Sequence, residues 1–317
     1  MAHIEIETAG TTGPERSEPV AFAPVRPPSV GPGPEPLAPE RPMVARAAGS
    51  ALARDLRTVR VLWQREMIRF ARNRVRLAMG LVTPLMFLLI LGTGLNSLVG
   101  DSSDGLGDYR AYLFPGVLIM AVQAPAIAVG VTIVWDRQAG FLRQMLVAPV
   151  RRGVLLTGIC LGGAATGAAH GALVLAVAGA AGVPYTPQLL LVLLELALIS
   201  FAFTALGVLA AVCIRRIETF QVVVGMFMMP LLFLSGAMFP ARGLPGWLGG
   251  AVLVNPLTYG VDALRRTLPG DVATPGGVAT GPQWWGWTPP VLLEVAFLAV
   301  AALVALTLAT RRFARAE

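Results

Sequence analysis

Few residues of this chain could do chemistry, and their spacing does not assemble a catalytic set. An enzyme embedded in a membrane would need paired carboxylates, clustered histidines or a nucleophile beside a base. The two histidines are His3, in a Pro-rich tail, and His170, in a run of Gly and Ala. The two cysteines, Cys160 and Cys213, belong to apolar runs and lack metal-ligand spacing. The sequence therefore predicts no catalytic site, metal site or disulfide, and a membrane-embedded enzyme is kept only as an alternative.

The basic residues argue against an ATP site on this chain. All 25 are arginines, because the sequence contains no lysine. A P-loop needs the pattern GxxxxGK[ST], in which a lysine and backbone N–H groups hold the phosphates. We therefore expect this chain to bind no cofactor. The net charge of +7 does not indicate nucleic acid, because the arginines cluster beside apolar runs, as charges that flank membrane spans do.

Three ionisable residues stand inside apolar runs. A carboxylate in hydrocarbon is costly, so Glu195 is expected to face other helices or a wet cavity, and both a structural role and a role in a transport pathway are open. Glu294 lies near the start of the last run and could reach water. His170 could, while neutral, hydrogen-bond a neighbouring helix. A proton-driven carrier would require more such carboxylates and an internal repeat, and the sequence has neither.

The elements that must position these residues are membrane-spanning helices. Hydrophobic residues make up 55% of the chain, charged residues make up 14%, and the mean hydropathy is +0.68. Soluble domains carry about 25% charged residues. The composition therefore predicts an all-α polytopic membrane protein.

Two segments precede the first span. Residues 1–50 are Pro-rich and almost free of large apolar side chains, which predicts a disordered cytoplasmic tail. Residues 51–76 place apolar side chains at spacings of three and four, opposite an arginine-rich face. That pattern is typical of a helix lying in the membrane interface, in contact with lipid. Its apolar stripe consists of Leu56, Val59, Trp63, Met67 and Phe70.

Six apolar runs are long enough to cross a bilayer, which takes about 20 helical residues. They cover 77–98, 112–134, 154–181, 188–213, 219–239 and 290–310, within a transmembrane domain at 77–312. The third is rich in Gly and Ala, which allow close packing of helices. Two shorter pieces, 244–254 and 256–266, follow the fifth run and predict a re-entrant helical hairpin hinged at Asn255-Pro256.

Arginine asymmetry predicts the orientation, because cytoplasmic loops carry the excess of basic residues. Arginines lie before the first span, between the second and third, between the fourth and fifth, and after the sixth. Both termini are therefore expected in the cytoplasm, with the hairpin on the opposite side. Arg242, Arg265 and Arg266 are exceptions to this rule.

The loop between the second and third spans carries a short amphipathic pattern over 140–147, which Pro149 ends. Such a helix could insert into a groove of a soluble partner or lie in the membrane interface, and the spacing leaves both open.

Two motifs resemble the permease subunit of ABC-2 type transporters, in particular the daunorubicin-resistance-type drug efflux group. The first is the loop motif, formed by Asp136, Arg137, Gly140, Leu142, Met145 and Pro149. The second is formed by Ser235, Gly236, Pro240, Leu244, Pro245, Trp247, Leu248, Asn255, Pro256, Leu257, Thr258, Tyr259 and Arg265. The resemblance covers roughly 56–312. The chain departs from it at Gln138 and Ile159, where the family often has an acidic residue and a lysine.

This resemblance implies a permease without ATPase activity of its own, paired with a second permease chain, as a homodimer, and with two ABC ATPase subunits. ATP and Mg would be bound by those subunits, and the loop motif together with Phe141 would form the coupling helix. The second motif would form an external gate. The implied cargo is a hydrophobic or amphiphilic, drug- or antibiotic-like compound exported across a bacterial plasma (inner) membrane. Related permeases export polysaccharides, lipids or lipid-linked glycans, which is the alternative.

Overall fold

The computed structural model describes residues 51–99, 109–139, 151–238, 245–270, 281–282, 284 and 287–315, and this part of the chain is helical, without a strand. The helices are α1 (Ala51–Arg72), α2 (Arg74–Val99), α3 (Tyr109–Gln138), α5 (Arg152–Leu175), η2 (Ala178–Ala181), α6 (Leu189–Cys213), α7 (Ile217–Leu234), α8 (Gly246–Val254), α9 (Pro256–Thr267) and α10 (Val291–Arg315). Among the described residues, six of them (α2, α3, α5, α6, α7 and α10) are long and apolar enough to cross a membrane. The predicted all-α fold with six spans is confirmed.

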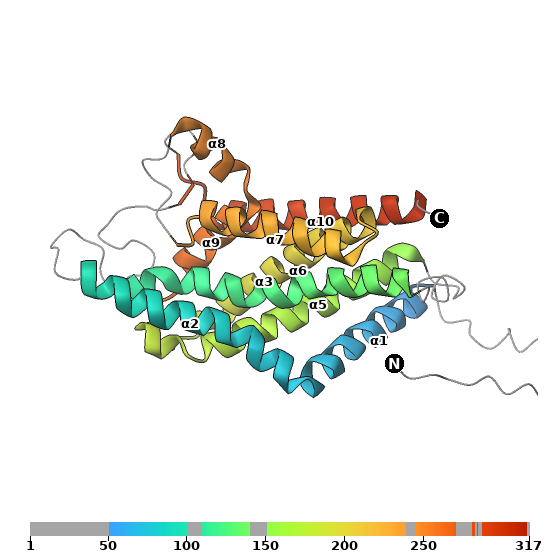
Figure 1. Cartoon of the computed structure of the whole chain (residues 1–317), viewed down its shortest axis with the longest axis horizontal. Coiled ribbons are helices and arrows are strands. Elements are labelled where there is room, and N and C mark those ends of the chain that lie inside the picture. The colour runs from blue at the N-terminus through green and yellow to red at the C-terminus, as the bar shows by residue number, and fades with distance from the viewer. Residues whose placement is uncertain are drawn as a thin grey trace, which may run out of the picture. The chain divides into compact units, whose positions relative to one another are not determined.

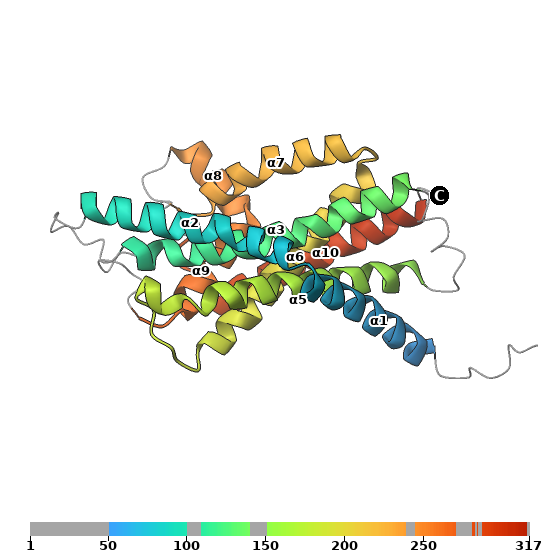
Figure 2. The same cartoon turned by 60° about the horizontal axis from the view of Figure 1, so that its bottom comes forward.

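The core of the bundle lies around α3, α5 and α6, which pack against one another (Figures 1 and 2). Small residues on α5 make this packing close. A Cβ added at Gly163 would come 2.5 Å from Cγ2 of Thr204 on α6, and one at Gly167 would clash with Ser200. The expectation that the Gly- and Ala-rich span permits close approach is therefore confirmed. The α-helix α5 ends at Leu175, earlier than the expected residue 181. The chain continues after a turn into η2, which is a short 3-10 helix.

Two spans are covered much less by the rest of the chain. In the most apolar stretch of α3, 61% of the residues are buried inside the protein. In the corresponding stretches of α2 and α7, only 17% and 11% of the residues are buried. Apolar side chains on both helices therefore face either lipid or another protein chain. Helices α2 and α7 also border an apolar groove.

Helix α1 ends at Arg72, and the chain bends at Asn73 before α2 begins (Figure 1). The helix expected over 51–76 is therefore interrupted at Asn73, and residues 74–76 belong to α2. Asn73 accepts a hydrogen bond from the backbone N–H of Arg76 through Oδ1, at 3.0 Å, which caps the start of α2. Helix α1 packs along α5, with Leu62 buried there. Of the predicted apolar stripe, Leu56 and Trp63 remain 61% and 41% exposed, whereas Val59, Met67 and Phe70 are half-buried. Only part of the stripe is therefore free to face lipid.

Candidate functional site

The junction between α8 and α9 is held by the side chains of the second motif. Asn255 Oδ1 accepts from the backbone N–H of Leu257 at 3.0 Å, which caps α9, and Asn255 Nδ2 donates to the carbonyl of Leu231 at 2.7 Å. Leu231 is in the last turn of α7, where carbonyls have no partner within the helix. Pro256 occupies the first turn of α9, where its missing N–H costs nothing. Asn255 thus joins α7 and α9 at one point.

Thr258 and Tyr259 complete this junction. The Thr258 hydroxyl donates to the carbonyl of Val252 and the Tyr259 hydroxyl to that of Leu253, both at 2.8 Å. These carbonyls end α8 and would otherwise lack partners. Trp284 Nε1 donates to the Tyr259 hydroxyl at 3.1 Å. The succession of Asn, Pro, Thr and Tyr therefore has a local physical reason, since each residue satisfies or avoids an unpaired backbone group at the hinge.

Arg265 lies beneath this hinge and is 1% exposed. Its Nη2 donates to the carbonyl of Gly236 at 3.1 Å, and its guanidinium carbon lies 4.3 Å from the centre of the Tyr112 ring. Gly236 has φ +77°, in the left-handed region that favours glycine, and the Tyr112 hydroxyl donates to the same carbonyl at 3.3 Å. Burial lowers the pKa of Arg265, while the nearby Tyr112 and Asp262 raise it. One arginine thus connects α9, α3 and the turn after α7.

The structure therefore brings together five residues of the predicted external gate, namely Ser235, Gly236, Asn255, Pro256 and Tyr259. Pro245 precedes α8, and Trp247 on that helix is 77% exposed and away from this cluster. Pro240 and Leu244 lie outside the described residues. That these residues act as a gate remains a prediction.

A buried ionic cluster joins α9 to α10. Arg266 Nη2 lies 2.5 Å from Asp262 Oδ2 and 3.6 Å from Glu294 Oε1. Arg266 Nη1 also donates to the carbonyl of Pro289 at 2.7 Å. The Glu294 side chain is fully buried, so the expectation that it reaches water is wrong. Its sequence position near the end of a span gave no sign of Asp262 and Arg266 on another helix.

Glu195 of α6 is attached to the same region. Its Oε1 accepts from the Thr267 hydroxyl, at the end of α9, at 2.7 Å. The carboxylate therefore faces another helix, as expected, and it holds α9 against α6. Arg265 and Arg266 make hydrogen bonds and ion pairs within the protein. These contacts explain why both arginines are exceptions to the asymmetry from which the orientation was predicted.

At the opposite end of the bundle, the last turn of α3 carries Asp136 and Arg137, the described residues of the loop motif (Figure 1). Arg137 Nη1 donates to the carbonyls of Val212 and Ala211, at 3.2 and 3.5 Å, and these are among the last carbonyls of α6. Asp136 is partly buried beside it. Gly140, Phe141, Leu142, Met145 and Pro149 lie outside the described residues, so the coupling helix remains a prediction. After this loop, Arg151 Nη1 lies 4.0 Å from Asp55 Oδ2 of α1.

His170 lies at the elbow between α1 and α2. Its Nδ1 donates to the carbonyl of Thr166 on its own helix, at 3.0 Å, and not to a neighbouring helix as expected. Its ring contacts another helix instead, edge-on to Phe70 of α1 with ring centroids 4.9 Å apart.

A cavity of about 110 Å³ lies at this elbow, and the sequence did not predict it. It is lined by Glu66, Arg69, Asn73, Arg76, Thr166 and His170 among others. The sequence feature that could have indicated this cavity is Asn73, an asparagine between two arginine-rich helical stretches.

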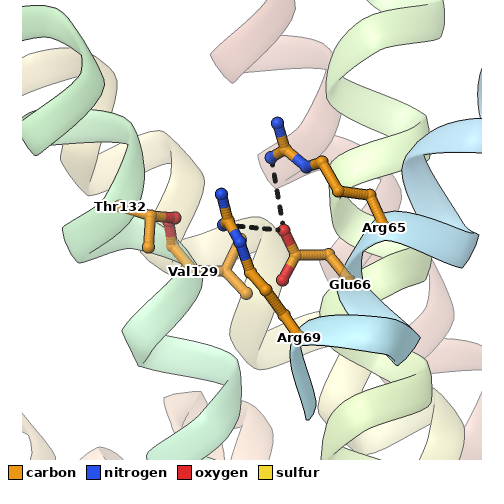
Figure 3. Close-up of polar contacts among 5 residues, drawn as sticks. All are labelled: Arg65, Glu66, Arg69, Val129 and Thr132. Carbon is orange, nitrogen blue, oxygen red and sulfur yellow. Dashed lines mark hydrogen bonds and ion pairs between the residues drawn. The ribbon is translucent and has the colours of Figure 1, made fainter. Parts of the chain in front are cut away.

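The arginines of the elbow share one carboxylate. Glu66 Oε1 lies 3.3 Å from both Arg65 Nη2 and Arg69 Nη1. Figure 3 shows the two guanidinium groups converging on this carboxylate, with Val129 and Thr132 of α3 across from them.

An apolar groove of about 370 Å³ lies between α2, α3 and α7. Its lining includes Met79, Pro84, Met120, Ile127, Met228 and Leu232, and its polar members are Thr83 and Gln123. Flexible methionine side chains adapt to apolar surfaces of different shapes. The sequence gave no sign of this groove, because its lining comes from three separate spans.

Comparison with known proteins gives a match to a family model described as "ABC-2 type transporter" over residues 57–268, which contain most of α1 and all of α2 to α9. Nodulation protein J of Rhizobium leguminosarum bv. trifolii is 29% identical over 212 residues, covering 66% of this chain and 80% of that protein. The inner membrane transport permease YadH of Escherichia coli K12 is 28% identical over 207 residues, covering 64% and 80%. The putative transport permease ycf38 of Cyanophora paradoxa is 26% identical over 226 residues, covering 65% and 72%.

Proposed function

The chain belongs to the ABC-2 type transporter family, and from this premise we propose that it exports a hydrophobic or amphiphilic compound using ATP hydrolysed by a separate subunit. Membership makes it the membrane subunit of an ABC exporter. The identity of the cargo and the arrangement of subunits belong to the proposal. Asp136, Arg137 and the loop up to Pro149 transmit the ATPase cycle to the spans, and Mg and ATP are held by the partner.

The groove between α2, α3 and α7 is the observation that carries the choice of cargo. Its volume of about 370 Å³ and its lining of Met, Ile, Leu and Pro suit an apolar compound. Ligand sites commonly combine such apolar walls with a few polar groups that fix orientation. Thr83 and Gln123 supply those groups here.

A second copy of this chain completes the pathway. The groove is bordered by α2 and α7, the two spans that the rest of the chain covers least. A second permease that packed against α7 would bury its exposed side chains, Met226 and Phe227 among them, and close the groove from that side. The assembly we propose has two permease chains and two ATPase subunits. The short helices α8 and α9 then cover the external end of the pathway.

Export of a polysaccharide, lipid or lipid-linked glycan is the second candidate. One relative's name refers to nodulation, the others' to transport permeases, and none of the three specifies a drug. Such a cargo would need a wider path than the groove within one chain provides.

The proposal is tested by uptake into inside-out membrane vesicles that contain this chain with or without a co-expressed ABC ATPase. A fluorescent amphiphile should accumulate on addition of ATP only when both proteins are present. Accumulation with this chain alone would contradict the proposal. Transport of a lipid-linked glycan, without the amphiphile, would favour the second candidate.

A further inference from the structure

We propose that the elbow between α1 and α2 binds the phosphate of an anionic phospholipid headgroup, from the leaflet that borders the elbow. The residues that would hold the phosphate line the surface of the elbow, and none of them lines the groove between α2, α3 and α7. This site does not depend on which cargo is exported.

The elbow concentrates positive charge that the described part of the chain does not neutralise. Residues 65–76 contain five arginines and one glutamate, a net charge of +4. The single carboxylate, Glu66, is already shared by Arg65 and Arg69. No carboxylate in the described part of the chain forms an ion pair with Arg72, Arg74 or Arg76. An anion from outside the protein is therefore favoured at this point.

The shape of the elbow suits a phosphate. A shallow hollow of about 620 Å³, widely open to the surroundings, is lined by Arg65, Ile68, Arg69, Arg72, Asn73, Arg74 and Val75. Guanidinium groups bind phosphate oxygens in bidentate fashion, which a cluster of arginines around one hollow permits.

The start of α2 adds to this attraction. The N–H groups in the first turn of a helix have no acceptor within it, and the helix dipole favours negative charge there. Asn73 caps the N–H of Arg76. The N–H groups of Arg74 and Val75 are the others at this end, and both residues line the hollow.

The apolar surface next to the hollow identifies a lipid, and not free phosphate, as the source. Arg74 opens the candidate membrane span of α2, so the hollow lies at the boundary of the apolar layer. Val75 lines the hollow and begins an exposed apolar row on α2, which continues through Met79, Val82 and Met86. Spacings of four, three and four place these side chains on one face of the helix. A phosphate at the elbow can therefore extend its acyl chains along this row.

A matched pair of charge variants tests the site. Arg72→Gln with Arg74→Gln removes two arginines that line the hollow, and Arg57→Gln with Arg60→Gln removes two exposed arginines elsewhere on α1. Each full-length protein is reconstituted in phosphatidylcholine vesicles, and electron spin resonance compares the association of spin-labelled phosphatidylglycerol and phosphatidylcholine. The preference for phosphatidylglycerol should fall about fivefold for each arginine removed from the hollow. The control variant should stay close to wild type.

Equal preference in the hollow variant and in wild type would overturn the proposal. An equal loss in both variants would also overturn it, because that result would indicate diffuse attraction and no site. A further arm adds inorganic phosphate, against sodium chloride of the same ionic strength. Displacement of the spin-labelled lipid by phosphate beyond the sodium chloride control would identify a soluble anion as the ligand and overturn the assignment to lipid.

Discussion

Arg265 shows how a single buried charge can organise one end of the bundle. It contacts the turn after α7 through the carbonyl of Gly236 and contacts α3 through the ring of Tyr112. A buried charge without partners would be very unfavourable, so these contacts fix the position of α9. Through these contacts the guanidinium of Arg265 reaches two other elements at once.

Replacement of Arg265 by leucine should therefore lower stability by about 3 kcal/mol, because it removes a charge-assisted hydrogen bond and a cation–π contact. Arg265→Lys should lose less, because it keeps the charge but not the planar group. Thermal unfolding of the purified protein in detergent measures both effects. Arg60→Leu, at an exposed position, is the control. Equal unfolding temperatures for Arg265→Leu and wild type would show that Arg265 does not hold α9.

The boundary between the short helices α8 and α9 is determined by side-chain contacts at their junction. Neither is long enough to cross a membrane. Their separation at Asn255-Pro256 follows from the capping bond to Leu257 and from the bond to the last turn of α7. The pair is thus a hinge attached to α7, which is the arrangement that an external gate would require.

Asn255→Ala should loosen this hinge by about 2 kcal/mol, since it removes a helix cap and one further hydrogen bond. Hydrogen–deuterium exchange should rise in α8 and in the first turn of α9 while the core of α3 stays protected. Val254→Ala changes an exposed neighbour and should leave exchange unchanged. Unaltered exchange in Asn255→Ala would mean that other contacts hold the hinge.

The spans could be predicted from the sequence because crossing a membrane demands a long apolar run, which is a local property. The end of α5 could not, since Gly and Ala continue past Leu175 while the chain turns into η2. The burial of Glu294 depends on Asp262 and Arg266, and the groove depends on three spans. Such contacts between distant segments leave no mark in hydropathy or periodicity. The contact of the His170 ring with Phe70 of α1 is another such distant contact, whereas its hydrogen bond stays within its own helix, to the carbonyl of Thr166.

At the scale of the whole molecule, the described residues of the two motifs lie at opposite ends of the bundle. Helices α8 and α9 lie at the end away from the C-terminus, whereas α3 approaches its loop at the end near it (Figure 1). Arg137 ties that end of α3 to the end of α6, and Glu195 of α6 accepts from Thr267 of α9. Helix α6 therefore provides a continuous physical link between the two ends. A movement imposed at the loop can reach α9 through it.

Gly140→Pro and Phe141→Asp should each abolish stimulation of the partner ATPase while leaving membrane insertion intact. Proline would break a helix at this position, and a carboxylate would be unfavourable in an apolar groove of the partner. ATP hydrolysis by the reconstituted complex, together with the amount of protein in the membrane, measures these effects. Arg143→Gln, on the polar side of the same segment, is the control. Normal stimulation in both variants would contradict a coupling role for the loop.

The central claim is that this chain moves its cargo only when a separate subunit hydrolyses ATP. The most direct measurement is uptake of a fluorescent amphiphile into inside-out vesicles that contain this chain and an ABC ATPase whose P-loop lysine is intact or replaced by alanine. Uptake should occur with the intact ATPase and fall to the level of vesicles without ATPase when the lysine is replaced. Equal uptake with both forms of the ATPase would contradict the account.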